Sequence, residues 1–291
     1  ISPAIDFGQV AGAPTDDLDN FTRISNPDAG CYERNPCPNG DISDVDNGGV
    51  YYIGPTGDWA TLTDALVELK SCMVGTTTLE IEPTYDETTE TYPIDFNGLP
   101  AGMSSTFHLT IRPKSDVVST ITFDDSQTST LFDFNGCKYI YVDGRPGGSG
   151  SNKYFTIENT SSATSGSAIN FSNDATYNEI KYCNVKANYG NNGSGTPTFG
   201  IIHFADGVGA GSGNSNNTIE NCIIDGTATM VDPTTADGIG EIGIYSNSST
   251  SPANSNNIIQ NCEFKNIFID NGSQHRYTRG IYLLNGNDSW T

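Results

Sequence analysis

Acidic and amide side chains gather in one short segment near the start of the chain, and their oxygen atoms are ligands of the kind that hard cations prefer. Asp41, Asp44, Asp46 and Asn47 all fall within DISDVDNGG. Calcium takes several oxygen ligands of this type, but the segment lacks the twelve-residue spacing that ends in Glu. Two interpretations therefore stay open: a calcium site, or solvated turns in which the Asp and Asn side chains bond to nearby backbone.

Basic side chains that could contact an anionic sugar occur at two places. Arg145 ends the segment YIYVDGR, and His275, Arg276 and Arg279 form the basic cluster late in the chain. Guanidinium groups suit carboxylate and phosphate recognition because their donors form a planar fork. The plainer alternative places Arg145 in a strand-ending turn and the late cluster in a solvated loop.

The remaining ionisable residues are interpreted as structural. Asp124-Asp125 is predicted to form a turn, and His108 and His203 lie inside the apolar segments FHLTI and IIHFAD, where packing is expected. The sequence contains no Ser-His-Asp, zinc-ligand or phosphate-loop pattern, since its many glycines stand in turn-like contexts. We therefore assign no catalytic residue and expect no cofactor other than calcium.

Three cysteines recur at a nearly constant interval. The segments ATYNEIKYCNV, NSNNTIENCII and NSNNIIQNCEF align without gaps and place an Ile three residues before each Cys, at Ile180 and Cys183, Ile219 and Cys222, and Ile259 and Cys262. A cysteine column would suit a metal or redox centre. A buried free Cys also behaves as a small hydrophobe, and equivalent cysteines on stacked strands point the same way, which is poor geometry for a disulfide. We prefer the packing interpretation. Cys31 and Cys37 are close enough in sequence to close a small disulfide.

The repeat determines the expected fold. Each period of about forty residues holds short segments of alternating apolar residues, separated by Gly, Asn, Ser and Thr, and no helix-like pattern. A four-stranded propeller blade has a similar length but needs antiparallel hairpins. Stacked turns of a right-handed parallel β-helix explain better why equivalent strands recur once per period. They would place the isoleucines in one interior column and the cysteines in another.

One segment departs from the strand pattern. Residues 61–72 carry Leu62, Ala65, Leu66 and Leu69 on one helical face, and Thr61 with Asp64 matches a helix start. A stack of strands exposes an apolar end that must be covered. The sequence therefore predicts an all-β, right-handed parallel β-helix with an N-terminal capping α-helix, beginning near Val50.

Composition limits the function. The chain has 13 Lys and Arg against 35 Asp and Glu, a formal net charge of −22. Such a charge argues against nucleic acid and anionic membranes as partners, because these bind clustered cations. No apolar run approaches the length of a membrane span, and no export signal is recognisable at the start, so we expect both ends to be cuts within a longer polypeptide.

Residues 50–291 resemble the pectin-lyase-like β-helix proteins of Bacteroidetes-type bacteria, especially large secreted surface proteins. The resemblance rests on YYIGPTGDWATLTDALVELK, on YIYVDGR and on the NNTIENC-type repeat. It implies a β-helix exported to the cell surface. Lyases of this family use Asp- or Glu-bound calcium with an Arg or Lys base, and its hydrolases use clustered aspartates; neither set is recognisable here.

The start of the chain looks like the closing stretch of such a β-helix. SPAIDFG, PTDDLDN and NPDAGCYE carry this second resemblance, although Ala29 and Cys31 depart from the family's pattern. We therefore expect three parts: residues 1–40 close a preceding domain or connect to a neighbouring domain or subunit, residues 41–49 form an acidic linker, and residues 50–291 form the β-helix, truncated at its C-terminus.

The function expected from these observations is a non-catalytic structural or adhesive module of a bacterial cell-surface or filament-forming protein. Its expected partners are neighbouring copies of the same domain and extracellular polysaccharide. The alternative is a polysaccharide lyase or glycoside hydrolase acting on acidic polysaccharide.

Overall fold

The structure is a computed structural model that describes residues 49–73, 75–126, 130–161, 166–187, 199–206, 211–226, 242–248, 252–267 and 279–291. The predicted closing segment, residues 1–40, and nearly all of the acidic linker therefore lie outside the described residues, as do Cys31 and Cys37.

Three parallel sheets dominate the fold, and we name them I, II and III. Sheet I contains β1 (Val50–Ile53), β2 (Thr77–Ile81), β4 (Leu109–Pro113), β7 (Ile140–Asp143), β10 (Glu179–Lys181), β13 (Thr218–Glu220) and β17 (Ile258–Gln260). Sheet II contains β5 (Ile121–Asp125), β8 (Phe155–Asn159), β11 (Cys183–Ala187), β14 (Ile223–Asp225) and β18 (Glu263–Lys265). Sheet III contains β3 (Ile94–Asp95), β6 (Thr130–Asn135), β9 (Ser167–Ser172), β12 (Ile202–Phe204), β15 (Ile242–Ser246) and β19 (Arg279–Leu283).

Three helical elements and one further pair of strands complete the described chain. These are the helix α1 (Leu62–Cys72), the 3-10 turns η1 (Glu87–Thr89) and η2 (Pro146–Gly148), and the parallel pair β16 (Asn254–Ser255) and β20 (Asn287–Asp288). The prediction of an all-β fold built on parallel strands is confirmed.

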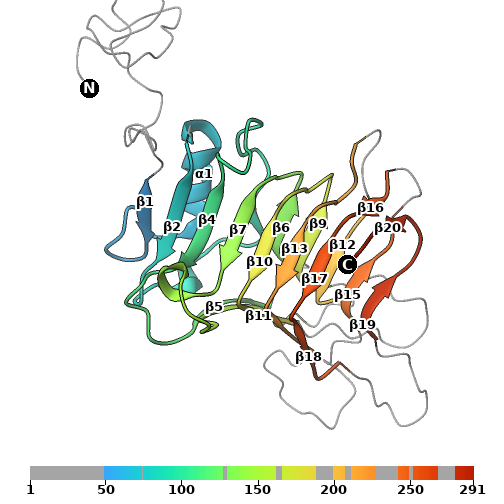
Figure 1. The fold of residues 1–291 in the computed structure, drawn as a ribbon. Coiled ribbons are helices and arrows are strands. Elements are labelled where there is room, and N and C mark those ends of the chain that lie inside the picture. The colour runs from blue at the N-terminus through green and yellow to red at the C-terminus, as the bar shows by residue number, and fades with distance from the viewer. Residues whose placement is uncertain are drawn as a thin grey trace, which may run out of the picture.

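The chain visits the three sheets in a fixed order. From β7 onward each passage runs through sheet I, then sheet II, then sheet III, as in β7-β8-β9 and β10-β11-β12. Strands one passage apart pair in register, so that Ile180 lies beside Ile219, and Ile219 beside Ile259. Figure 1 shows the result as a row of strands that runs from β1 and β2 to β17 and β19. One period of the sequence repeat thus corresponds to the step from one strand to the next strand of the same sheet.

The core is built by side chains that take the same position on successive strands. In sheet III the rings of Phe96, Phe134, Phe171 and Phe204 follow one another with centroid separations of 4.8, 4.9 and 4.5 Å. These distances are the ordinary spacing of neighbouring strands, so the rings stack because the strands do. All four side chains are fully buried.

Asparagine side chains form a second kind of column at a corner between sheets. The Oδ1 atom of Asn217 accepts from the backbone N–H of Asn178 at 3.0 Å, and the Oδ1 of Asn257 accepts from the N–H of Asn217 at 2.9 Å. The neighbouring residues Asn216 and Asn256 take positive φ angles of 59° and 56°. Asparagine tolerates this conformation and bonds locally, which explains its recurrence at these turns.

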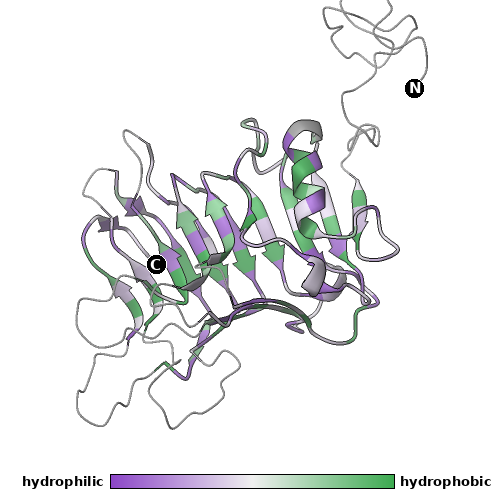
Figure 2. Ribbon diagram, turned by 180° about the vertical axis from the view of Figure 1, so that it is seen from behind, coloured by the Kyte–Doolittle hydropathy of each residue, from purple (hydrophilic) through white to green (hydrophobic). Residues whose placement is uncertain are grey.

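The predicted helix is confirmed; it lies at the end of the row where β1 and β2 stand (Figures 1 and 2), and it packs against β3. Its buried side chains are those expected from the sequence: Leu62, Ala65, Leu66 and Leu69. The Thr61 hydroxyl accepts from the N–H of Asp64 at 3.0 Å, which caps the first turn. The Glu90 carboxylate accepts from the N–H groups of Leu62 and Thr63 at 2.8 and 2.9 Å, so the positive end of the helix dipole meets a negative charge.

Candidate functional site

The residues predicted to bind calcium, Asp41, Asp44, Asp46 and Asn47, lie outside the described residues, and so do His275 and Arg276. Within the described part of the chain, no group of three or more His, Cys, Asp or Glu side chains is placed to hold a metal ion. The calcium hypothesis therefore stays a prediction.

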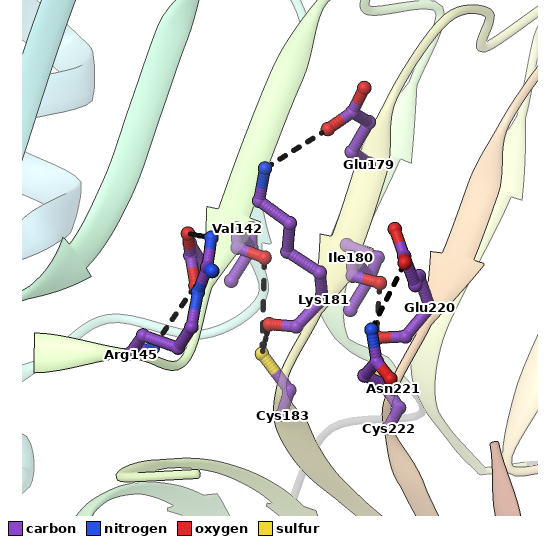
Figure 3. Close-up of polar contacts among 10 residues, drawn as sticks. Val142, Arg145, Glu179, Ile180, Lys181, Cys183, Glu220, Asn221 and Cys222 are labelled. Carbon is purple, nitrogen blue, oxygen red and sulfur yellow. Dashed lines mark hydrogen bonds and ion pairs between the residues drawn. The ribbon is translucent and has the colours of Figure 1, made fainter. Parts of the chain in front are cut away.

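Arg145 is held by its own sequence neighbour. Its Nε and Nη2 donate to the two carboxylate oxygens of Asp143 at 2.9 and 2.7 Å (Figure 3). Its guanidinium also lies 4.4 Å from the ring centroid of Tyr182. These contacts raise the pKa of Arg145, chiefly through the hydrogen bond to Asp143. The ion pair with Asp143 thus favours the protonated form of the guanidinium. The Asp143 carboxylate also neutralises the positive charge of Arg145, which the carboxylate of an acidic sugar would need for binding.

Ile180, Ile219 and Ile259 pair on neighbouring strands of sheet I, and Cys222 interacts with both Cys183 and Cys262. Cys183 and Cys222 each lie against backbone carbonyl oxygens of sheet I, with the Cys183 sulfur 3.3 Å from the Lys181 oxygen and the Cys222 sulfur 3.5 Å from the Ile180 oxygen (Figure 3). Burial raises the pKa of Cys222 well above that of a free thiol, which favours the protonated, unreactive form. These observations support the packing interpretation.

The expectation that all three cysteines are buried is wrong for the last one. Cys262 is half-buried, and so is Ile259, whereas Cys183 and Ile180 are fully buried. Both exceptions lie on the last described passage through sheets I and II, where no further strand covers them. The difference therefore comes from position in the row and not from residue type.

A continuous file of polar and aromatic side chains runs along the outer side of sheet III. The file comprises the residues that occupy one register position on six neighbouring strands: Asp95, Asp133, Asn170, His203, Tyr245 and Tyr282. The first five each stand next to a buried residue, such as Phe96, Phe134 or Phe204, and so point the opposite way; Tyr282 pairs with Tyr245 and takes the same position on β19. We call this set the sheet III file.

A hollow of about 500 Å³ lies over the middle of the sheet III file. It is lined by Pro93, Thr130, Asp133, Asn170, Phe199, His203 and Ala205. The Nδ2 of Asn170 donates to the Oδ1 of Asp133 at 2.9 Å, and the hydroxyl of Ser172 lies 3.5 Å from the same oxygen. The hollow therefore combines a carboxylate, an amide, an imidazole and an aromatic ring within one small volume.

Partial burial controls the charge of the hollow. Burial raises the pKa of Asp133, and the negative charge of the nearby Asp95 raises it further. The hydrogen bond from Asn170 partly opposes this shift. Burial also lowers the pKa of His203 to about 4. The imidazole is thus neutral at physiological pH and presents one donor and one acceptor nitrogen.

Aromatic rings continue the file beyond the hollow. The ring of His203 lies 4.8 Å from Phe199 and 5.7 Å from Tyr245, and Tyr245 lies 5.8 Å from Tyr282. The guanidinium of Arg279 lies 3.6 Å from the centroid of Tyr282. Arg279, predicted to join His275 and Arg276, is thus placed by the structure at the aromatic end of the sheet III file.

This site was not predicted from the sequence, in which His203 fits a packing position inside IIHFAD. A usable signal was present: the segments IDF, FDF, INF and IHF each place one polar residue between two apolar ones. Aligning them would have put Asp95, Asp133, Asn170 and His203 on one side of a sheet. These side chains line a hollow only because Pro93 and Phe199, which belong to connecting segments, complete its walls.

No family model, curated protein or solved structure matches this chain. In the described ranges no helix is long and apolar enough to cross a membrane.

Proposed function

We propose that the chain is a non-catalytic, extracellular module of the pectin-lyase-like type, a right-handed parallel β-helix whose sheet III file binds a glycan. The β-helix part is supported by the fixed order in which the chain visits the three sheets and by the in-register pairing of successive strands. The resemblance of residues 50–291 to large secreted surface proteins supports the localisation.

The observation that carries the glycan proposal is the chemical make-up of the sheet III file. Sugars present hydroxyl groups at their edges and C–H groups on their faces. Asp133, Asn170 and His203 offer donors and acceptors for hydroxyl groups, while Phe199 and Tyr282 offer ring surfaces. Binding pockets commonly combine apolar walls with a few fixed polar groups, and the bond from Asn170 fixes Asp133 in this way.

A second candidate function is glycoside hydrolysis, favoured by the two aspartates of the sheet III file. Asp95 and Asp133 lie side by side on β3 and β6, and the pKa of Asp133 is raised, mainly by burial. Glycosidases use one carboxyl group that stays protonated and a second that is ionised. Asp95 is the candidate for the second carboxyl group, and its Oδ1 accepts from the N–H of Asn97 at 2.8 Å.

The test compares two histidines on different faces. His203 lines the hollow, whereas the ring of His108 lies 4.6 Å from that of Tyr141, outside the hollow. Binding to a panel of neutral and acidic oligosaccharides is measured by calorimetry for the native protein, His203→Ala and His108→Ala. We expect His203→Ala to weaken binding about tenfold or more, the effect of losing roughly 1.4 kcal/mol, and His108→Ala to leave it unchanged.

The same panel separates the two functions. The glycan proposal fails if no sugar binds the native protein, or if both variants, shown to be folded by circular dichroism, weaken binding equally. Release of reducing ends that Asp133→Asn abolishes would instead establish the hydrolase.

A further inference from the structure

The residues that line the hollow of the sheet III file carry no positive charge. Within the described part of the chain the lining set holds one carboxyl group, that of Asp133, and no Lys or Arg. Asp95 lies beside Asp133 on the neighbouring strand, and its negative charge acts on Asp133. His203 is the other ionisable side chain of this set, and because its pKa is lowered to about 4 the imidazole is neutral at physiological pH. An anionic ligand would therefore find no cation among these side chains.

The sequence around the lining residues also lacks cations. Residues 187–264, which include His203, contain no Lys or Arg, and residues 115–137, which include Asp133, contain none either. Among the described strands of sheet III the basic residue is Arg279 on β19, two strands beyond the strand of His203. The net charge of −22 adds a general repulsion of anions. Both observations disfavour an acidic sugar in the hollow.

Hydrogen-bond acceptors outnumber donors at the centre of the hollow. An ionised Asp133 carboxylate can only accept, and Asn170 already uses its Nδ2 to donate to it at 2.9 Å. The Oδ1 of Asn170 is buried and has no donor among the described residues. Neutral His203 adds one donor and one acceptor. The hollow therefore suits a ligand group that is rich in donors, and an ammonium group has three donors and no acceptor.

We propose that the glycan bound by the sheet III file contains an amino sugar with a free amine, and that this ammonium group lies in the hollow against Asp133. The inference rests on the proposed glycan-binding function and adds the class of sugar. A charge pair at a partly buried carboxylate is stronger than the same pair in water, so the amine provides selectivity. N-acetylation removes the positive charge, and a uronic acid brings a second negative charge to Asp133.

The test compares ligands that differ mainly in charge. The chitosan hexamer and its fully N-acetylated counterpart, the chitin hexamer, share one sugar backbone, and a hexamer of galacturonic acid supplies the acidic case. Calorimetry is performed at about pH 6, where such an amine is protonated. A salt concentration of about 0.15 M largely screens charges more than about 8 Å apart, which reduces binding of the cationic hexamer to the rest of this acidic protein.

Two aspartate variants separate the hollow from the general negative charge. Asp133→Asn removes the proposed partner of the amine. Asp124→Asn on β5 removes an equal charge outside the hollow, from a carboxylate that is also partly buried and accepts from the Thr160 hydroxyl at 2.9 Å. We expect the native protein and Asp124→Asn to bind the chitosan hexamer about tenfold or more tightly than either other hexamer. Asp133→Asn should bind the chitosan and chitin hexamers equally.

The results that would overturn the inference differ in what they imply for glycan binding. If the chitin or galacturonic acid hexamer binds the native protein as tightly as the chitosan hexamer, and His203→Ala weakens that binding, the glycan function stands and the amino-sugar class is wrong. A preference for the chitosan hexamer that survives Asp133→Asn, or that Asp124→Asn abolishes equally, places the amine outside the hollow. If no glycan binds, both the function and the inference fail. Circular dichroism verifies that every variant is folded.

Discussion

The two ends of the row of strands bury their apolar side chains to very different degrees. At the first end, Ile53 on β1 and Leu69 on α1 are fully buried, and Leu66 is 2% exposed. At the other end, Ile281 and Leu283 are as exposed as many surface residues. Both sets face the interior of the row, so residue type does not explain the difference.

The difference shows that an inward position is buried only when a further layer lies on it. Each strand in the middle of the row has a neighbour on both sides, which covers its side chains and pairs its backbone groups. At the first end α1 supplies that layer, and Thr61 and Glu90 bind its free N–H groups. Among the described residues, no helix covers β19 in a comparable way.

The largest expected effect comes from placing a charge at the covered end. Leu66→Asp should destabilise the protein by about 4 kcal/mol or more, because it buries an unpaired carboxylate. Val67→Asp, next to it on the exposed side of α1, should cost roughly 0.5 kcal/mol or less. Ile281→Asp at the open end should cost about 1 kcal/mol. Urea unfolding measures all three, and equal losses for Leu66→Asp and Ile281→Asp would contradict the comparison of the two ends.

An intermediate effect is expected from the asparagines. Asn214 accepts from the N–H of Ala175 at 3.0 Å and donates to the oxygen of Ala205 at 2.7 Å, and it is fully buried. Asn214→Ala should cost about 2–4 kcal/mol because it leaves buried backbone groups without partners. Asn287, at the equivalent corner near the open end, is partly exposed, and Asn287→Ala should cost about 1 kcal/mol. Thermal unfolding, monitored by circular dichroism, would show which variant loses more stability. A larger loss for Asn287→Ala than for Asn214→Ala would contradict the idea that such losses decrease toward the open end of the row.

The smallest expected effect concerns the first turn of α1. Thr61→Ala removes the acceptor of the Asp64 N–H and should cost about 1 kcal/mol, whereas Thr61→Ser keeps the hydroxyl and should recover most of it. Chemical unfolding of the two variants provides the measurement. A loss that Thr61→Ser fails to recover would mean that the Thr61 methyl group, and not the cap, holds the helix.

Sequence alone predicted the parts of the molecule that repeat. The spacing of Ile180, Ile219 and Ile259 predicted their pairing because a repeat period places equivalent residues on neighbouring strands. The repeat did not predict the hollow. Asp133, Asn170 and His203 lie on three different strands of sheet III, and Pro93 and Phe199, which enclose them, belong to connecting segments.

Local pattern was sufficient for properties that depend on neighbours in the sequence or on the repeat: strand alternation, the α1 cap at Thr61, and the columns of Ile and Asn. Only the tertiary structure decided which ionisable groups change their pKa and which inward residues stay exposed. The pKa of His203 falls to about 4 through burial, and Ile281 is exposed although its sequence context matches that of the buried Ile244. Both properties depend on what lies over a residue in space, and no short-range pattern encodes that.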